Sequence, residues 1–155
     1  MPEQETLKRA RRDARQGKAA TTQAGEFIRE EMHHIREGKH GARSTKQAVA
    51  IGLSKARRSG VKLGAPKKGR SSATVRQKAK SDLRKGQSAS RKKTSTTRSR
   101  ATLGALQREG HSAASKKSLS RQARTAAKAR SAADRHQAAM KSVRTKRKTG
   151  LKRAA

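Results

Sequence analysis

The sequence predicts a mostly α-helical protein, made of a short helical hairpin and a largely disordered or conditionally helical basic tail. Large apolar residues recur at helical spacing mainly between residues 26 and 63. Hydrophobic residues make up only 30% of the chain, and Phe27 is its sole aromatic residue, so little area is available for a core. Lys and Arg outnumber Asp and Glu by 43 to 10, and the resulting net charge of +33 opposes compaction.

Residues 1–24 are expected to form a polar helix followed by a linker. The segment EQETLKRARRDARQGK has glutamates near its start and arginine near its end, which suits the helix dipole. Its apolar stripe contains only Leu7, Ala10 and Ala14, so this helix should be marginal by itself. The next stretch, AATTQAG, is expected to be the linker.

Residues 25–63 are expected to form the helical hairpin. In EFIREEMHHIREGK, one helical face carries Phe27, Ile28, Met32 and Ile35, and the glycines of GKHG end the helix. A unit of roughly 40 residues is at the limit of independent stability, so we consider a homodimer through this hairpin.

The second helix of the hairpin has clear start and packing signals. Ser44 precedes TKQAVAIGLSKARRSG with capping-box spacing to Gln47. Gly52 interrupts the apolar stripe of this helix, where glycine is less favourable than alanine by about 1 kcal/mol. We therefore expect another helix to approach closely at Gly52.

Residues 64–155 form the predicted basic tail, which begins at the Gly-, Pro- and Ser-containing stretch GAPKKGRSS. From residue 67 onward there are 28 basic and 3 acidic residues. A short helix is expected in SRATLGALQREG. Residues 118–148 are Ala-rich without Pro or Gly, so we expect a segment that fluctuates alone and becomes helical when phosphates neutralise its charges.

Several classes of protein are disfavoured by the sequence. The chain has no cysteine, which excludes disulfides and cysteine-based zinc sites. No apolar run approaches the roughly 20 residues of a spanning helix, and the first residues do not resemble a signal peptide. We therefore expect a cytoplasmic protein without a membrane partner. No nucleophile, base and orienting group stand together, so we expect no enzyme and no cofactor.

Three motifs lack the residues or the context that their chemistry requires. GAPKKGRS nearly fits a phosphate-binding loop, but Arg70 replaces the required Lys and no strand precedes it. KKGR is similar to a minor-groove hook, but Ser71 stands where such hooks usually carry Pro. The histidines His33, His34 and His40, with Glu30 and Glu37 nearby, lack the spacing of a metal-binding helix, so we expect a polar face and no metal site.

The excess of cations predicts a polyanion as partner. Lys and Arg in an unpatterned Ala/Ser background suit contacts with phosphates and not the reading of bases. Binders of single strands and RNA loops usually stack bases on aromatic side chains, which this chain lacks, so duplex DNA is favoured over RNA. Arginine stacking leaves an RNA- or ribosome-associated protein open. A protein-interaction hairpin that the tail merely localises is a third hypothesis.

The residues expected to contact DNA phosphates fall into two groups. On the hairpin they are Lys39, Arg43, Lys46, Lys55, Arg57, Arg58 and Lys62. On the tail they are Lys67, Lys68, Arg70, Arg91, Lys92, Lys93, Lys146, Arg147 and Lys148.

The segment REGKHGARSTKQAVAIGLSKARRSGV, residues 36–61, resembles the signature of a family of small, basic bacterial proteins of unknown function. Many members of that family are labelled DNA-binding proteins. HSAASKK and LSRQAR in the tail are similar to the C-terminal segments of longer members. The resemblance implies a bacterial cytoplasmic or nucleoid protein and brings no mechanism. The sequence thus predicts a non-enzymatic, sequence-tolerant, nucleoid-associated DNA-binding protein.

Overall fold

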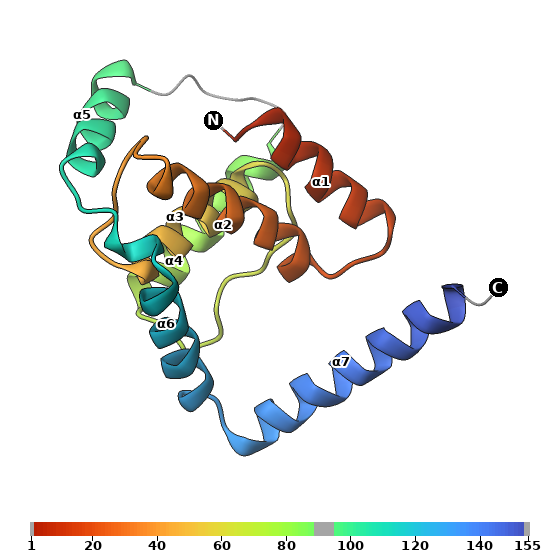
Figure 1. Cartoon of the computed structure of the whole chain (residues 1–155). Helices are drawn as coiled ribbons and strands as arrows, with labels where there is room; N and C mark the ends of the chain where they lie inside the picture. Colours follow the sequence, from red (N-terminus) through yellow and green to blue (C-terminus); the bar gives the residue numbers. More distant parts are fainter. Residues whose placement is uncertain (1, 89–94, 154–155) are drawn as a thin grey trace. The chain divides into compact units, whose positions relative to one another are not determined.

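The computed structural model describes residues 2–88 and 95–153, with the side chains of 145, 146 and 148–153 left out. Within these ranges it contains seven α-helices, one 3-10 helix and no strand (Figure 1). The mostly α-helical class is therefore confirmed, and the helices extend well beyond a short hairpin. The chain divides into two compact units, Met1–Ser118 and Leu119–Ala155.

The first two helices are α1 (Gln4–Arg15) and α2 (Ala20–Arg36), which pack against each other. The helix expected near the N-terminus is confirmed, but the expected linker AATTQAG is wrong for most of its length, because α2 already begins at Ala20. Ala24 is completely buried, so packing makes this stretch helical although it carries no large apolar residue.

The third helix, α3 (Thr45–Arg58), begins as the sequence predicts. Ser44 Oγ accepts a hydrogen bond from Gln47 N at 3.2 Å. The Gln47 side chain accepts in turn from Arg43 N at 3.0 Å, one residue earlier than in a standard capping box. Before the turn, Gly38 has φ +74°, a backbone conformation that favours glycine.

The close approach expected at Gly52 is confirmed. A Cβ atom added at Gly52 would lie 2.8 Å from Ile28 Cα and 3.0 Å from Ile28 N, on the backbone of α2. The two helices therefore cross with almost no side-chain layer between them at this point. This contact sets the distance between α2 and α3.

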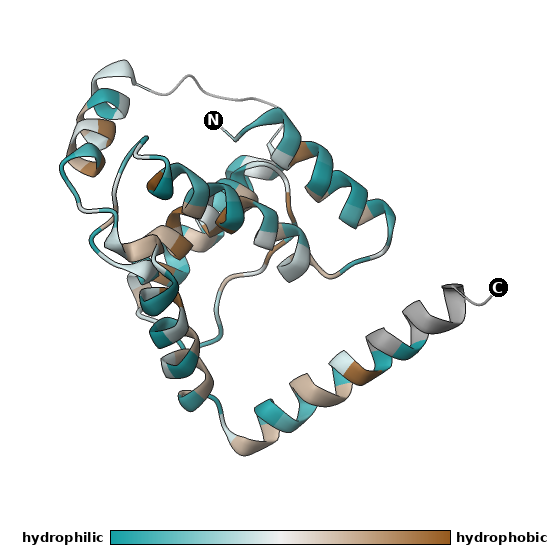
Figure 2. Ribbon diagram, viewed as in Figure 1, coloured by the Kyte–Doolittle hydropathy of each residue, from teal (hydrophilic) through white to brown (hydrophobic). Residues whose placement is uncertain are grey.

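The core between these helices is small and rich in alanine. Its buried members are Ala10, Ala24, Phe27, Ala56 and Val61, with the partly buried Leu7, Ala20, Leu53 and Leu63 around them. Strongly hydrophobic residues are correspondingly few along the ribbon (Figure 2). Phe27, only 1% exposed, is the largest of the buried side chains and fills the space that the alanines leave.

Helix α4 (Ala73–Gln87) was not predicted, because residues 64–95 have a low-complexity composition. It packs against α3, and Ser54 Oγ donates a 2.7 Å hydrogen bond to Asp82 Oδ2 across the contact. A Cβ atom added at Gly86 would overlap the carbonyl oxygen of Arg57, so the backbones of the two helices come close there as well. Small residues again allow the packing that large apolar residues would otherwise drive.

Helix α5 (Thr96–Gln107) is followed by the 3-10 helix η1 (Ser112–Ala114), and residues 106–114, from the end of α5 through η1, dock on the turn between α2 and α3. Gly41 N donates to Leu106 O at 2.8 Å and Ala42 N to Gly110 O at 3.0 Å. Thr45 Oγ1 donates to Ala113 O at 2.7 Å. The hairpin is therefore covered by α1, α4 and this docked segment of the same chain.

The last two helices are α6 (Lys116–Lys128) and α7 (Ala132–Arg153). The single helix expected over 118–148 is thus interrupted between Lys128 and Ala132, and Ser131 Oγ begins α7 by accepting from Asp134 N at 3.1 Å. Most described side chains beyond residue 118 are exposed, including those of Met140 (58%) and Val143 (48%). Over the described residues, these helices have no core of their own.

Candidate nucleic-acid interface

Carboxylates decide which cations of this protein are available to a partner. Seven of the ten acidic residues lie within residues 1–37. Several of them hold a cation inside the compact unit: Lys18 Nζ lies 2.7 Å from Asp13 Oδ1, and Arg9 Nε lies 2.8 Å from Glu26 Oε2. Cations paired in this way are already partly neutralised.

Lys55 and Arg57, both expected to contact phosphates, are occupied inside the protein. Lys55 Nζ lies 2.7 Å from Glu31 Oε2 and 3.3 Å from Glu30 Oε1, and both carboxylate side chains are 1% exposed. Lys55 is therefore engaged within the protein and not available to a phosphate, because two buried carboxylates need a cation.

Arg57 is buried and donates hydrogen bonds to Leu63 O at 3.1 Å and Gly64 O at 3.2 Å. Burial lowers the pKa of Arg57, and the charge of Asp82 opposes that shift. We therefore no longer expect Lys55 and Arg57 to contact DNA phosphates.

Lys39 and Arg43 are accessible but already have acidic partners. Lys39 Nζ lies 3.0 Å from Glu37 Oε2 and 3.3 Å from Glu3 Oε1, and these carboxylates raise the pKa of Lys39, Glu37 more than Glu3. Arg43, whose side chain is 83% exposed, pairs with Glu109 at 3.2 Å. A phosphate would have to compete with those carboxylates.

Some of the other expected contact residues lie outside the described part of the chain, and the rest are exposed. Arg91, Lys92 and Lys93 lie outside the described residues, as do the side chains of Lys146 and Lys148. The remaining members of the expected set are exposed: Lys46, Arg58, Lys62, Lys67, Lys68, Arg70 and Arg147.

Helix α6 presents a cationic stripe that was not among the expected contact residues. Lys117, Arg121, Arg124 and Lys128 are spaced by four, three and four residues, which places them on one face of the helix. All four are exposed, and α6 contains no acidic residue. We call these four residues the α6 stripe. The spacing is visible in the sequence, but runs of adjacent Lys and Arg are the more conspicuous signal.

The second unit is strongly one-sided in charge. Residues 119–155 contain twelve Lys and Arg against one acidic residue, Asp134. In Figure 2, teal segments alternate with tan and brown ones along the coloured part of α7. Its exposed cations therefore have little carboxylate competition.

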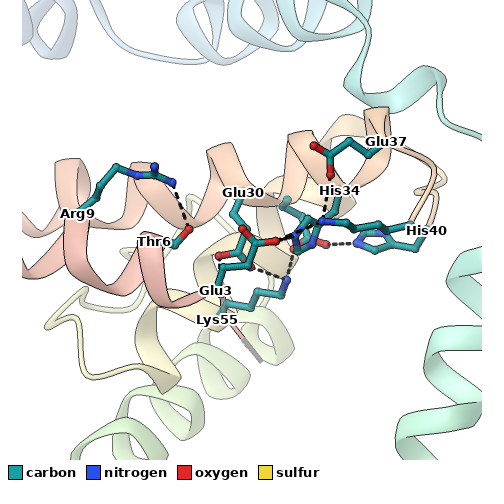
Figure 3. A network of polar contacts seen from close by, with 10 residues as sticks. Glu3, Thr6, Arg9, Glu30, His34, Glu37, His40 and Lys55 are labelled. Carbon is teal, nitrogen blue, oxygen red and sulfur yellow. Dashed lines mark hydrogen bonds and ion pairs between the residues drawn. The ribbon is translucent and has the colours of Figure 1, made fainter.

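The structure also corrects the expectation for two of the histidines. His34 and His40 do not simply form a polar helix face, because they converge with Glu31, which the residue spacing does not single out. One possible ligand atom from each of the three lies within 4.8 Å of the others. Figure 3 shows His34 and His40 in the surrounding polar network with Glu3, Glu30 and Lys55. His33, by contrast, is exposed.

Glu3 links the start of α1 to this network. His34 Nε2 lies 2.7 Å from Glu3 Oε1, and Glu3 N donates to Glu30 Oε2 at 3.1 Å. Hydrogen bonding from His34, and then from Lys39, lowers the pKa of Glu3. The network therefore joins α1, α2, α3 and the turn after α2.

Comparisons with known proteins do not identify the chain: no family model, no curated protein and no solved structure matches it. Among the described helices, none combines the length and the apolar character that crossing a membrane requires.

Proposed function

We propose that this protein is a non-enzymatic, sequence-tolerant DNA-binding protein that holds duplex DNA by its phosphates. The observation that carries the proposal is the α6 stripe, in which four exposed cations share one face of a helix without an acidic residue. Each cation that neutralises a phosphate releases counterions, and this contribution does not depend on base sequence. Nucleoid association and membership of the basic bacterial family belong to the same proposal.

The α6 stripe has dimensions that suit a phosphate backbone. Lys128 lies eleven positions after Lys117, so the stripe is roughly 16 Å long at 1.5 Å per residue. A DNA strand carries a phosphate about every 3.4 Å along the helix axis. Several phosphates therefore lie within the length of the stripe, and the long Lys and Arg side chains can adapt to their positions.

The helicity of the tail is part of the proposal. Described residues beyond 118 bury almost no large apolar side chain, and repulsion among their cations opposes helix formation. We propose that this part of the tail fluctuates in free solution and becomes stably helical when phosphates neutralise it. Circular dichroism should then show a gain of helix when duplex DNA is added.

Duplex DNA is preferred to RNA in this proposal because no aromatic platform is available. Phe27 is 1% exposed and packs in the core, so it cannot stack on a base. A protein-interaction hairpin is disfavoured, because the apolar face of the hairpin packs against α1, α4 and the docked segment.

The experiment compares two quadruple variants of the full chain that change net charge equally. The first changes the α6 stripe: K117Q, R121Q, R124Q and K128Q. The second changes four exposed cations of α1: K8Q, R11Q, R12Q and R15Q. Affinity for a duplex of mixed sequence is measured over a series of salt concentrations, with structured RNA as competitor.

The stripe variant should lower the salt slope, the change in log affinity with log salt, by up to about 3.6, since each phosphate contact contributes about 0.9. The α1 variant should change the slope less, because Glu5, Asp13 and Glu26 already weaken the field around α1. Equal decreases of the salt slope in the two variants would mean that only net charge matters, and would overturn the role of α6. Salt-insensitive binding, or a preference for RNA, would overturn the proposal itself.

A further inference from the structure

We propose that Glu31, His34 and His40 form a binding site for one Zn²⁺ ion. The three residues come from two elements of the compact unit. Glu31 and His34 are three residues apart on α2 and therefore share a face, and His40 follows in the turn after α2. Their possible ligand atoms lie within 4.8 Å of one another. This proposal does not depend on DNA binding.

The hydrogen bonds of His40 indicate a cation beside it. His40 Nδ1 lies 3.1 Å from Gly41 O, and because a carbonyl oxygen only accepts, Nδ1 carries a proton. His40 Nε2 lies 3.0 Å from Glu31 Oε1. In a neutral ring, Nε2 would then direct its lone pair at a carboxylate oxygen. A proton or a metal ion must lie between these two atoms.

The surroundings of His40 also suit a metal ion. Metal-binding histidines usually donate their other ring nitrogen to a carbonyl or carboxylate, as His40 does to Gly41 O. Two ligands bound tetrahedrally to one ion at about 2.0–2.2 Å lie roughly 3.4 Å apart, so His40 Nε2 and Glu31 Oε1, now 3.0 Å apart, would need to separate only slightly to bind one ion. His34, whose Nε2 lies 2.7 Å from Glu3 Oε1, brings a third possible ligand to the same place, and a metal ion is the one partner that Glu31, His34 and His40 could share.

The charge around the site favours a further cation. Glu30 and Glu31 are both buried, and Lys55 is shared between them. One positive charge for two buried carboxylates leaves a negative charge to be balanced. Lys55 does not block the proposed site, because it contacts Glu31 Oε2 and leaves Glu31 Oε1 to face His40.

The ligand types select the metal. Two imidazoles with one carboxylate suit zinc and related transition metals, whereas Mg²⁺ and Ca²⁺ prefer oxygen ligands alone. Glu3 lies 2.7 Å from His34 Nε2 and is placed to orient that ring as a supporting carboxylate. The net charge of +33 repels stray cations, so stoichiometric zinc uptake by this chain would require a local site.

The test uses the full chain without an affinity tag, freed of metal by a chelator and then titrated with Zn²⁺ by calorimetry. One ion should bind per chain, and a zinc concentration 100-fold above the dissociation constant should raise the melting temperature by roughly 10 °C. Co²⁺ bound at the same site should show the visible absorption of a four-coordinate ion with nitrogen and oxygen ligands.

Adjacent histidines provide the matched control. His34→Ala and His40→Ala should weaken zinc binding by more than about 100-fold, because loss of a supporting residue alone weakens such sites 10–100-fold. His33→Ala removes an exposed histidine next to the site and should leave the affinity unchanged. His34 is more exposed than His40, so His34→Ala gives the test even if His40→Ala unfolds, which circular dichroism will reveal.

Three results would overturn the zinc proposal. The first is the absence of stoichiometric zinc uptake by the full chain. The second is an equal loss of affinity in the His33→Ala and His34→Ala variants. The third is an NMR spectrum in which His40 keeps both ring protons while zinc is present, because a proton would then occupy the position assigned to the ion.

Discussion

The units Met1–Ser118 and Leu119–Ala155 are both helical and both basic, yet their cations are used differently. The first unit has nine acidic residues, and each contacts a cation, a histidine or a hydroxyl group. The second unit has twelve cations and only Asp134 as an acidic residue. Carboxylates therefore pair with a minority of the 31 Lys and Arg residues of the first unit, whereas the second unit has a single carboxylate for its twelve.

The comparison shows that the density of Lys and Arg along a chain does not identify the cations that a ligand can reach. Lys55 and Arg57 lie in a dense basic run, but one is held by buried carboxylates and the other by backbone carbonyls. The α6 stripe has no run of adjacent cations except at its start, yet all four residues are exposed on one face. Burial and pairing decide the difference.

The largest expected contrast between the units is in core packing. Phe27→Ala should lower the free energy of unfolding by about 3–5 kcal/mol, because it empties the space that the surrounding alanines cannot fill. Met140→Ala on α7 should change it by less than about 0.5 kcal/mol, because Met140 is 58% exposed. Urea unfolding of both variants measures the contrast, and similar losses would mean that α7 also has a core.

A second contrast concerns the same residue type in two charge environments. Lys55→Met should destabilise the protein by about 3–5 kcal/mol, because it leaves Glu30 and Glu31 buried with too few cations. Lys128→Met on α6 should be nearly neutral for stability, since Lys128 is exposed. If Lys55→Met were also neutral in urea unfolding, the buried network would have no structural role.

The smallest contrast compares two helical glycines and predicts opposite signs. Gly52→Ala should destabilise the protein by about 1–3 kcal/mol, because the new Cβ would press on the backbone of Ile28. Gly104→Ala on α5 should stabilise by up to about 1 kcal/mol, because the nearest atom to its Cβ is the flexible end of Arg108 at 3.9 Å. Thermal unfolding followed by circular dichroism distinguishes them, and equal effects would remove the packing argument at Gly52.

The sequence alone was sufficient to predict features that depend on local interactions or on composition. The start of α3 follows from Ser44 and Gln47, whose side chains bond to backbone groups only three or four residues away. The close approach at Gly52 follows from a glycine placed in an apolar stripe. The dominance of positive charge, and with it the expectation of a polyanionic partner, is a property of composition.

Only the tertiary structure decided the features that depend on residues far apart in the sequence. The first turns of α2 and the whole of α4 are helical because small residues let backbones pack, which periodicity in large apolar residues cannot reveal. The meeting of His40 with Glu31, and of Lys55 with both Glu30 and Glu31, depends on how the chain folds back on itself. Composition set how much positive charge this protein carries, and folding set which of those charges are neutralised within it, because burial forces carboxylates to find partners.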